Sequence, residues 1–191
     1  ERCNSSFGLT SRRSTWSHSS SSPRKVRPRR LSSASWPLSH AHGRCCCCCY
    51  AGFFDGGAFH RIIPGFVIQG GDPNTKTDNK ASYGTGGHAA RYFGIGNESE
   101  PSSWTVPAEF NDISHKRGIL SMARSNDPNS GGSQFFICAA DAPHLNSQYT
   151  VFGQLIKGDQ VMEQIVNLSR DARDNPTRRV EMTVRLEKID D

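Results

Sequence analysis

Residues 59–72 read Phe-His-Arg-Ile-Ile-Pro-Gly-Phe-Val-Ile-Gln-Gly-Gly-Asp, with one arginine and one glutamine among apolar residues. The second half alternates as a strand does, with Val67 and Gln69 on the face opposite Ile68. The Pro-Gly pair in the middle predicts a turn just before that strand. A charged side chain on an apolar sheet surface is costly unless it is paired or used. Arg61 is therefore either paired with an acid at a sheet edge or part of a site.

Five sequence blocks follow one another in a fixed order. They are Phe-Asp-Gly-x-x-Phe-His-Arg-Ile-Ile-Pro-Gly-Phe at 54–66, Ile-Gln-Gly-Gly-Asp at 68–72, Gly-Ile-Leu-Ser-Met-Ala at 118–123, Gly-Ser-Gln-Phe-Phe-Ile at 132–137 and Val-Phe-Gly at 151–153. Together they resemble the cyclophilins, a family of peptidyl-prolyl cis/trans isomerases. The resemblance covers roughly residues 50–189, and the long loop at 84–109 is more similar to bacterial-type members than to the compact eukaryotic form.

The resemblance implies a mainly β fold, an antiparallel eight-stranded barrel capped by two helices, with a surface groove for an X-Pro segment. Apolar runs and alternation predict strands at 118–124, 133–139, 149–156 and 180–187. A short helix is expected to start at Asp159, which can cap it. Residues 73–109 are rich in loop residues. The family's first two strands and first helix are not recognisable, so we expect a cyclophilin-like domain over 50–191 that is incomplete at its N-terminus.

The resemblance also implies the site. Arg61 falls on the family's catalytic arginine, and Gln69 is expected to act with it. The other groove positions are Phe66, Val67, Ala123, Arg124, Gln134, Phe136, His144, Leu145 and Tyr149. Phe135 and Ile137 alternate with Phe136 and are expected in the core.

Four groove positions depart from the family's usual residues. Val67 stands in place of Met, Arg124 in place of Asn, His144 in place of the Trp of many eukaryotic members, and Tyr149 in place of their His. The inhibitor cyclosporin depends on that Trp, so we expect weak cyclosporin binding. The expected partners are proline-containing peptides and unfolded proteins.

The cysteines and histidines do not indicate a metal site or a disulfide framework. Five of the seven cysteines are adjacent at 45–49, whereas a disulfide framework or a zinc site needs spaced ligands. Cys138 lies in an apolar run and is expected to be buried. His88 and His115 stand alone in polar surroundings and are expected to be solvated rather than metal ligands. The barrier to X-Pro rotation is amide resonance, so no cofactor is expected either.

The first 49 residues differ in character from the rest of the 191-residue chain. They hold nine Lys/Arg and one acid, while residues 50–191 hold fourteen Lys/Arg and seventeen acids, so the net charge of +5 comes from the leader. These first 49 residues, the leader, are Ser/Arg-rich. They show neither the period of 2 typical of strands nor the period of 3.6 typical of helices, which predicts disorder. Three interpretations stay open: an organelle transit peptide, a basic RNA-binding arm, or an artefact of a misread frame or mis-spliced exon.

Three classes of function therefore compete. An isomerase would use Arg61 to accelerate X-Pro rotation, and a non-catalytic binding module would hold the same peptides without turnover. An RNA-associated protein would work through residues 1–49. No apolar run approaches the roughly 20 residues of a membrane span. We expect a cytoplasmic protein, or an imported one if the leader is a transit peptide.

Overall fold

The computed structural model describes residues 3–10 and 52–188 of the chain. Its strands are β1 (Cys3–Thr10), β2 (Arg61–Ile63), β3 (Val67–Gly70), β4 (Ile119–Met122), β5 (Phe135–Cys138), β6 (Val151–Gln154) and β7 (Glu181–Lys188). The helices are α2 (Asp159–Val166) and four 3-10 helices, Pro73–Lys76, Lys80–Ser82, Pro101–Ser103 and Pro143–Leu145. The expected strands at 118–124, 133–139, 149–156 and 180–187 are confirmed, each with slightly different ends.

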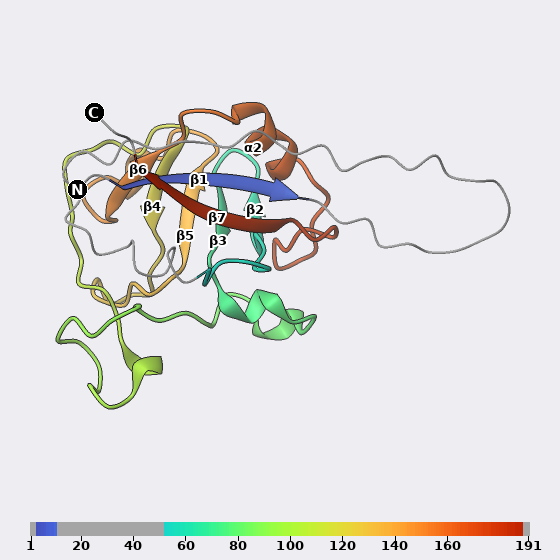
Figure 1. The fold of residues 1–191 in the computed structure, drawn as a ribbon. Coiled ribbons are helices and arrows are strands. Elements are labelled where there is room, and N and C mark those ends of the chain that lie inside the picture. Colours follow the sequence, from blue (N-terminus) through green and yellow to red (C-terminus); the bar gives the residue numbers. More distant parts are fainter. Residues whose placement is uncertain (1–2, 11–51, 189–191) are drawn as a thin grey trace, which may run out of the picture.

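The strands form two antiparallel sheets. Five of them pair in the order β2-β3-β5-β4-β6, and β1 pairs with β7. Figure 1 draws β1 and β7 across the five-stranded sheet. Backbone hydrogen bonds link the two sheets, since the N–H of Phe59 donates to Val180 and that of Met182 donates to Gly57. The mainly β, antiparallel fold is confirmed, but the strands described do not close into the expected eight-stranded barrel.

β2 and β3 form a hairpin around Pro64 and Gly65. Gly65 has φ 73°, a left-handed conformation that suits glycine, and the N–H of Phe66 donates to the carbonyl of Ile63. The expected turn is therefore confirmed. The hairpin register sets Arg61 directly opposite Gln69.

The two faces of the five-stranded sheet carry separate hydrophobic clusters. The inner cluster contains Phe54, Phe59, Ile62, Ile68, Leu120, Phe135, Ile137, Ala139, Met162, Ile165, Val166, Val180, Met182 and Val184. The outer cluster contains Val67, Ile119, Phe136, Cys138, Ala142, Leu145 and Val151, with Phe66, Ala123 and Tyr149 packed against it. Strand alternation explains this division, because neighbouring residues of one strand point to opposite faces. Phe135, Ile137 and Cys138 are buried, as expected.

The disorder predicted for the leader is wrong for its first residues. β1 runs antiparallel to β7 from the Cys3–Lys188 pair to the Thr10–Glu181 pair. Composition reports only what a segment prefers in isolation, whereas an edge strand offers unpaired N–H and C=O groups to any segment that reaches it. Residues 11–51, which include most of the leader, lie outside the described residues.

Asp159 does not cap α2, contrary to expectation. The capping residue is Gly158, with φ 99°. Asp159 lies in the first turn, where its carboxylate accepts a hydrogen bond of 3.0 Å from Nε of Arg117, and Glu163 accepts one of 2.8 Å from Nη2. An acid in the first turn suits the positive end of the helix dipole, so Asp159 serves as an anchor for α2. The buried face of the helix joins the inner cluster.

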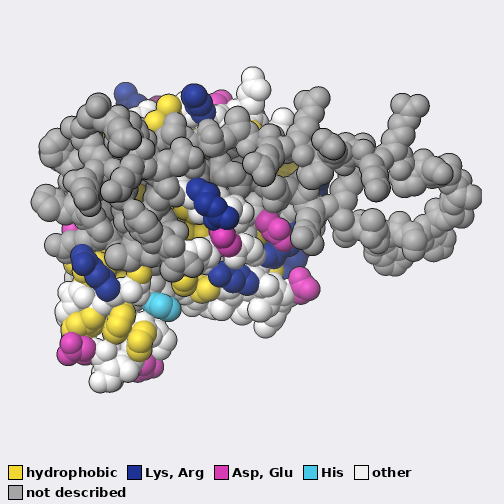
Figure 2. Space-filling view, viewed as in Figure 1, with side chains coloured by type: hydrophobic (Ala, Val, Ile, Leu, Met, Phe, Trp, Pro, Cys, Tyr) yellow, Lys and Arg dark blue, Asp and Glu magenta, His cyan; other side chains and the backbone are white. Residues whose placement is uncertain are grey.

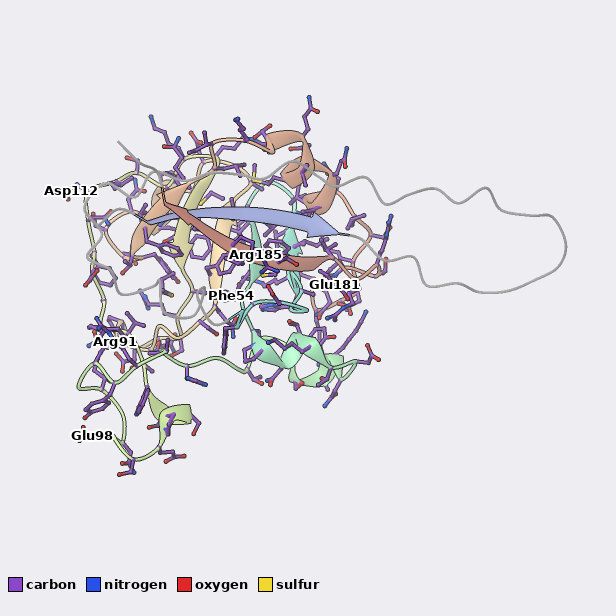
Figure 3. The ribbon with its side chains drawn as sticks, viewed as in Figure 1. Phe54, Arg91, Glu98, Asp112, Glu181 and Arg185 are labelled. Atoms are coloured by element: carbon purple, nitrogen blue, oxygen red, sulfur yellow. The ribbon has the colours of Figure 1, made fainter. Side chains whose placement is uncertain are left out.

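A lobe projects from the sheets between residues 88 and 106 (Figure 1). The N–H of Ala89 donates to the carbonyl of Trp104 at its base, and the indole N–H of Trp104 donates to Asn97. Figure 2 shows hydrophobic side chains gathered on this lobe, and Figure 3 places Arg91 and Glu98 in it. The lobe is thus held by its own polar contacts.

Two glycines with positive φ allow a matched test of the fold. Gly71 has φ 86°, and a Cβ there would overlap the carbonyl oxygen of Ser133, whereas a Cβ on Gly65 would meet no atom within 4 Å. We expect Gly65→Ala to lower the free energy of unfolding by about 1–2 kcal/mol, the cost of a left-handed alanine. Gly71→Ala adds overpacking and should cost at least about 3 kcal/mol. Urea unfolding would measure both, and equal losses would contradict the close approach.

Candidate active site

Arg61 and Gln69 face each other across the β2–β3 hairpin. Nη1 of Arg61 donates to Oε1 of Gln69 at 3.4 Å, and the Arg61 side chain keeps 42% of its surface exposed. The cross-strand pairing explains this contact, because directly opposed residues bring their side chains onto the same face. One nitrogen of the guanidinium therefore donates to Gln69, while much of the side chain stays open to solvent.

Gln134, at the entry to β5, decides how the Gln69 amide is oriented. Nε2 of Gln134 donates to the carbonyls of Gly84 (3.0 Å) and Gly86 (2.7 Å), so its Oε1 faces the other way. That oxygen accepts a 2.9 Å hydrogen bond from Nε2 of Gln69. The amide oxygen of Gln69 is thus left to face Arg61. We call Arg61, Gln69 and Gln134 the polar relay.

The loop that anchors the relay is held by a buried carboxylate. Asp72 is 1% exposed, and its two oxygens accept from the N–H groups of Gly84 (2.5 Å) and Asn74 (2.8 Å). A Cβ on Gly86 would overlap Asp72, so only glycine allows this approach. Hydrogen bonds therefore connect the buried Asp72 carboxylate, through the loop at 84–86 and the polar relay, to the partly exposed Arg61 side chain.

Aromatic and apolar side chains form a wall beside the relay. The rings of Phe66 and His144 stack at 5.4 Å with an interplanar angle of 28°. Phe136 and Tyr149 meet edge to face at 5.7 Å. Leu145 is buried in the same outer cluster. A wall of this kind can hold an apolar ring while the polar relay contacts the adjoining peptide group.

Val67 and Ala123 complete the set of residues that the sequence indicated for the groove. Val67 belongs to the outer cluster, and Ala123 packs against it. Ala123 also lines a pocket of about 310 Å³, together with Gln69, Gln134, residues 84–87, 124–125 and 132–133, and Ser130. The structure thus brings the expected groove residues to the outer cluster, the polar relay or the neighbouring pocket, except His144, which stacks on Phe66 beside them.

The Arg124 side chain is engaged within the protein. Its Nε and Nη2 donate to the carbonyl of Gln148 at 3.1 and 2.9 Å, and its Nη1 donates to that of Ser125 at 2.8 Å. The guanidinium carbon lies 4.5 Å from the Tyr149 ring centroid, which is cation–π geometry. Arg124 therefore braces Tyr149 from outside the wall.

The expectation that His115 is solvated is wrong. Its side chain is 1% exposed, and its ring stacks on Phe136 at 6.1 Å. Nε2 lies 3.0 Å from Oγ of Ser121, and Nδ1 lies 3.3 Å from Oδ1 of Asn146. Burial lowers the pKa of His115. The polar sequence neighbours of His115 suggested a solvated side chain, and only the fold places it behind the aromatic wall. His88 is half-buried, with Nδ1 2.8 Å from the carbonyl of Ala89.

No group of three or more His, Cys, Asp or Glu side chains suited to a metal ion occurs among residues 52–185. In the part of the chain that the structure describes, no helix has the length and hydropathy of a transmembrane span.

Comparisons with known proteins agree on one family. The profile for "Cyclophilin type peptidyl-prolyl cis-trans isomerase/CLD" matches residues 39–185. A "Probable peptidyl-prolyl cis-trans isomerase" of Brucella abortus is 40% identical over 136 residues, which is 70% of this chain and 65% of that protein. "Peptidyl-prolyl cis-trans isomerase CYP18-1" of Arabidopsis thaliana is 39% identical over 132 residues, 66% of this chain and 68% of that one. The chain thus spans about two thirds of the length of these relatives.

A solved structure shows the same fold. The cyclophilin-type peptidyl-prolyl cis-trans isomerase of Cryptosporidium parvum matches with a TM-score of 0.72 and 23% identity, over 100% of both chains. A second structure of that protein, determined in the presence of the dipeptide Ala-Pro, matches with a TM-score of 0.69 over 96% of this chain and 99% of that one.

His60, next to Arg61, makes the fold sensitive to acid. The side chain is 4% exposed, neither ring nitrogen has a hydrogen-bond partner, and burial lowers its pKa to about 4. Because the unfolded chain binds the proton at a higher pH, near 6.5, the neutral form stabilises the fold fully above that value. We expect up to about 3 kcal/mol of stability to be lost as the pH falls from 6.5 to 4. Urea unfolding at pH 7 and 4.5 would show this loss, and His60→Gln should remove most of it.

Proposed function

The chain belongs to the cyclophilin-type peptidyl-prolyl cis/trans isomerase family, and we propose that its groove binds X-Pro segments and accelerates their cis/trans rotation. The observation that carries the proposal is the polar relay beside the aromatic wall. The relay presents an exposed cation, and the wall offers stacked rings. These are the two features that a proline imide requires of a catalyst.

The chemistry needs no nucleophile. Rotation about an X-Pro bond has a barrier of ~18–20 kcal/mol because the nitrogen lone pair is delocalised into the carbonyl. In the twisted state the lone pair is localised on the nitrogen and can accept a hydrogen bond. Arg61 can donate that bond from a guanidinium that Gln69 already contacts. Such a bond is stronger in the transition state than in either ground state, which is the condition for catalysis.

The neighbouring residues have distinct parts in this proposal. Phe66, Phe136 and Leu145 hold the pyrrolidine ring, so that it stays in place while the preceding carbonyl turns. Gln69 donates one of its two amide N–H groups to Gln134, and the other can bind a carbonyl of a flanking residue. Both N–H groups of Gln134 donate to Gly84 and Gly86, so Gln134 orients Gln69. The polar relay keeps these amides in one orientation, so little reorganisation is needed on binding.

The magnitude of the Arg61 contribution is limited. A hydrogen bond from a charged donor is worth ~1.5–3 kcal/mol, which corresponds to about 10- to 150-fold in rate. Binding the ring in the apolar wall and excluding water must supply the remaining acceleration.

A relative with the same fold supports a proposal about which ligands this chain binds. The cyclophilin of C. parvum was crystallised in the presence of Ala-Pro. We propose that proline-containing peptides and unfolded chains with exposed X-Pro bonds are the partners here as well, since Phe66, Phe136 and Leu145 form an apolar wall in this chain.

Loss of Arg61 should abolish most of the activity. We expect Arg61→Ala to lower the rate of X-Pro exchange in a short peptide by about 10- to 150-fold, with little change in the free energy of unfolding. Exchange NMR would measure the rate. Arg91→Ala is the matched control, because Arg91 lies over the Phe93 ring in the projecting lobe (Figure 3). Peptide binding without any acceleration by the native chain would instead identify a non-catalytic binding module.

Residue 144 should control cyclosporin affinity. His144 stacks on Phe66 but offers less apolar area than the Trp of many eukaryotic cyclophilins. We expect weak cyclosporin binding by the native chain and about tenfold tighter binding by His144→Trp, because a larger ring adds buried area at the wall. Isothermal titration would compare the two, with His144→Phe as a control for aromatic area without an indole N–H. Equal affinities would contradict this role for the residue.

A further inference from the structure

The loop between α2 and β7 contains an unusual backbone conformation. Asp174 has φ 60°, and it shares positive φ with Ser147 alone among the described non-glycine residues. This conformation is costly for a residue with a Cβ, and such residues tend to persist where the surrounding structure holds them for a functional reason.

The turn around Asp174 is held at several points. Asp171 accepts the N–H groups of Arg173 (2.9 Å) and Asn175 (3.0 Å) through one carboxylate oxygen. Its backbone carbonyl accepts the N–H of Asp174 at 3.0 Å, and its own N–H donates to Asn175 at 2.9 Å. These bonds fix the direction of the Asp174 side chain.

Asp174 meets the hairpin next to Arg61. Its backbone carbonyl accepts the N–H of Ile62 at 2.9 Å, which docks the turn onto β2 one residue after Arg61. Its carboxylate oxygen Oδ2 lies 4.0 Å from Nε of Arg61. The other oxygen, Oδ1, lies 3.1 Å from Nε of Arg170. One acid therefore lies beside two arginines, one of which belongs to the polar relay.

We propose that Asp174 is a positioning residue for Arg61, an inference that rests on the proposed isomerase function. Gln69 contacts Nη1 of the Arg61 guanidinium, and Asp174 attracts it at Nε. A hydrogen bond at Nη1 and an ion pair at Nε together favour one orientation of the planar group. The remaining N–H groups are then presented to the bound imide in one orientation.

The energetics point to orientation rather than stability. The Arg61 and Asp174 side chains are 42% and 35% exposed, and exposed ion pairs of this kind add little to the free energy of unfolding. A costly backbone conformation that supports a weak ion pair brings little net stability. Placing the carboxylate beside Arg61 does affect the geometry of the group that contacts the substrate.

Two substitutions separate the carboxylate from the turn. Asn and Gly both tolerate positive φ, so Asp174→Asn and Asp174→Gly should keep the turn and remove the charge. We expect each variant to lower kcat about two- to fivefold with KM unchanged, the range set by an exposed ion pair. Glu163→Gln is the matched control: it also removes a carboxylate from an arginine partner, Arg117, but at α2.

NMR of the Arg61 side chain gives a readout that does not depend on activity. The Nε–Hε signal, assigned by its loss in Arg61→Ala, should show a high order parameter in the native chain and in Glu163→Gln. It should show a low one in both Asp174 variants. An unchanged order parameter in Asp174→Asn would overturn the proposal, as would lost order with unchanged kcat. If the native chain were inactive, the isomerase proposal would fail, and the order parameter alone would decide the role of Asp174.

Discussion

The structure of the site depends on the orientation of one side-chain amide. Gln134 donates to two backbone carbonyls of the Gly84–Gly86 loop, so its oxygen must face Gln69. That constraint turns the Gln69 oxygen toward Arg61. The half-buried Gln134 amide cannot exchange its donor and acceptor ends without losing these hydrogen bonds. The position of the cation is thus set by backbone groups far from it in the sequence.

Strand alternation places core residues on one face of the five-stranded sheet and candidate site residues on the other. The inner face of β3 and β5 packs against α2 and β7, while the outer face of the same strands carries Val67, Gln69 and Phe136. Val67, Gln69 and Phe136 are therefore each next in sequence to a residue of the inner cluster. A rigid core can hold the outer side chains in place.

Much of the fold could be predicted from the sequence, because period-2 alternation and turn residues act locally. The Pro-Gly turn and the burial of Phe135 and Ile137 both follow from such local patterns. His115 and Asp159 were predicted wrongly, because in both cases the sequence neighbours did not indicate the tertiary contacts. Polar sequence neighbours suggested a solvated histidine, whereas the fold stacks its ring beneath Phe136. An acid before an apolar stripe suggested a helix cap, whereas Gly158 takes that position and Asp159 binds Arg117.

The sequence alone determined strands β3 to β7, the turn between β2 and β3 and the family, because alternation, turn chemistry and motif order are properties of neighbouring residues. Only the tertiary structure decided the direction of the Gln69 amide, the pairing of β1 with β7, and the approach of Asp174 to Arg61. Those features join residues dozens of positions apart or more. Such contacts depend on the packing of whole elements, and no local pattern encodes the distance between two distant side chains.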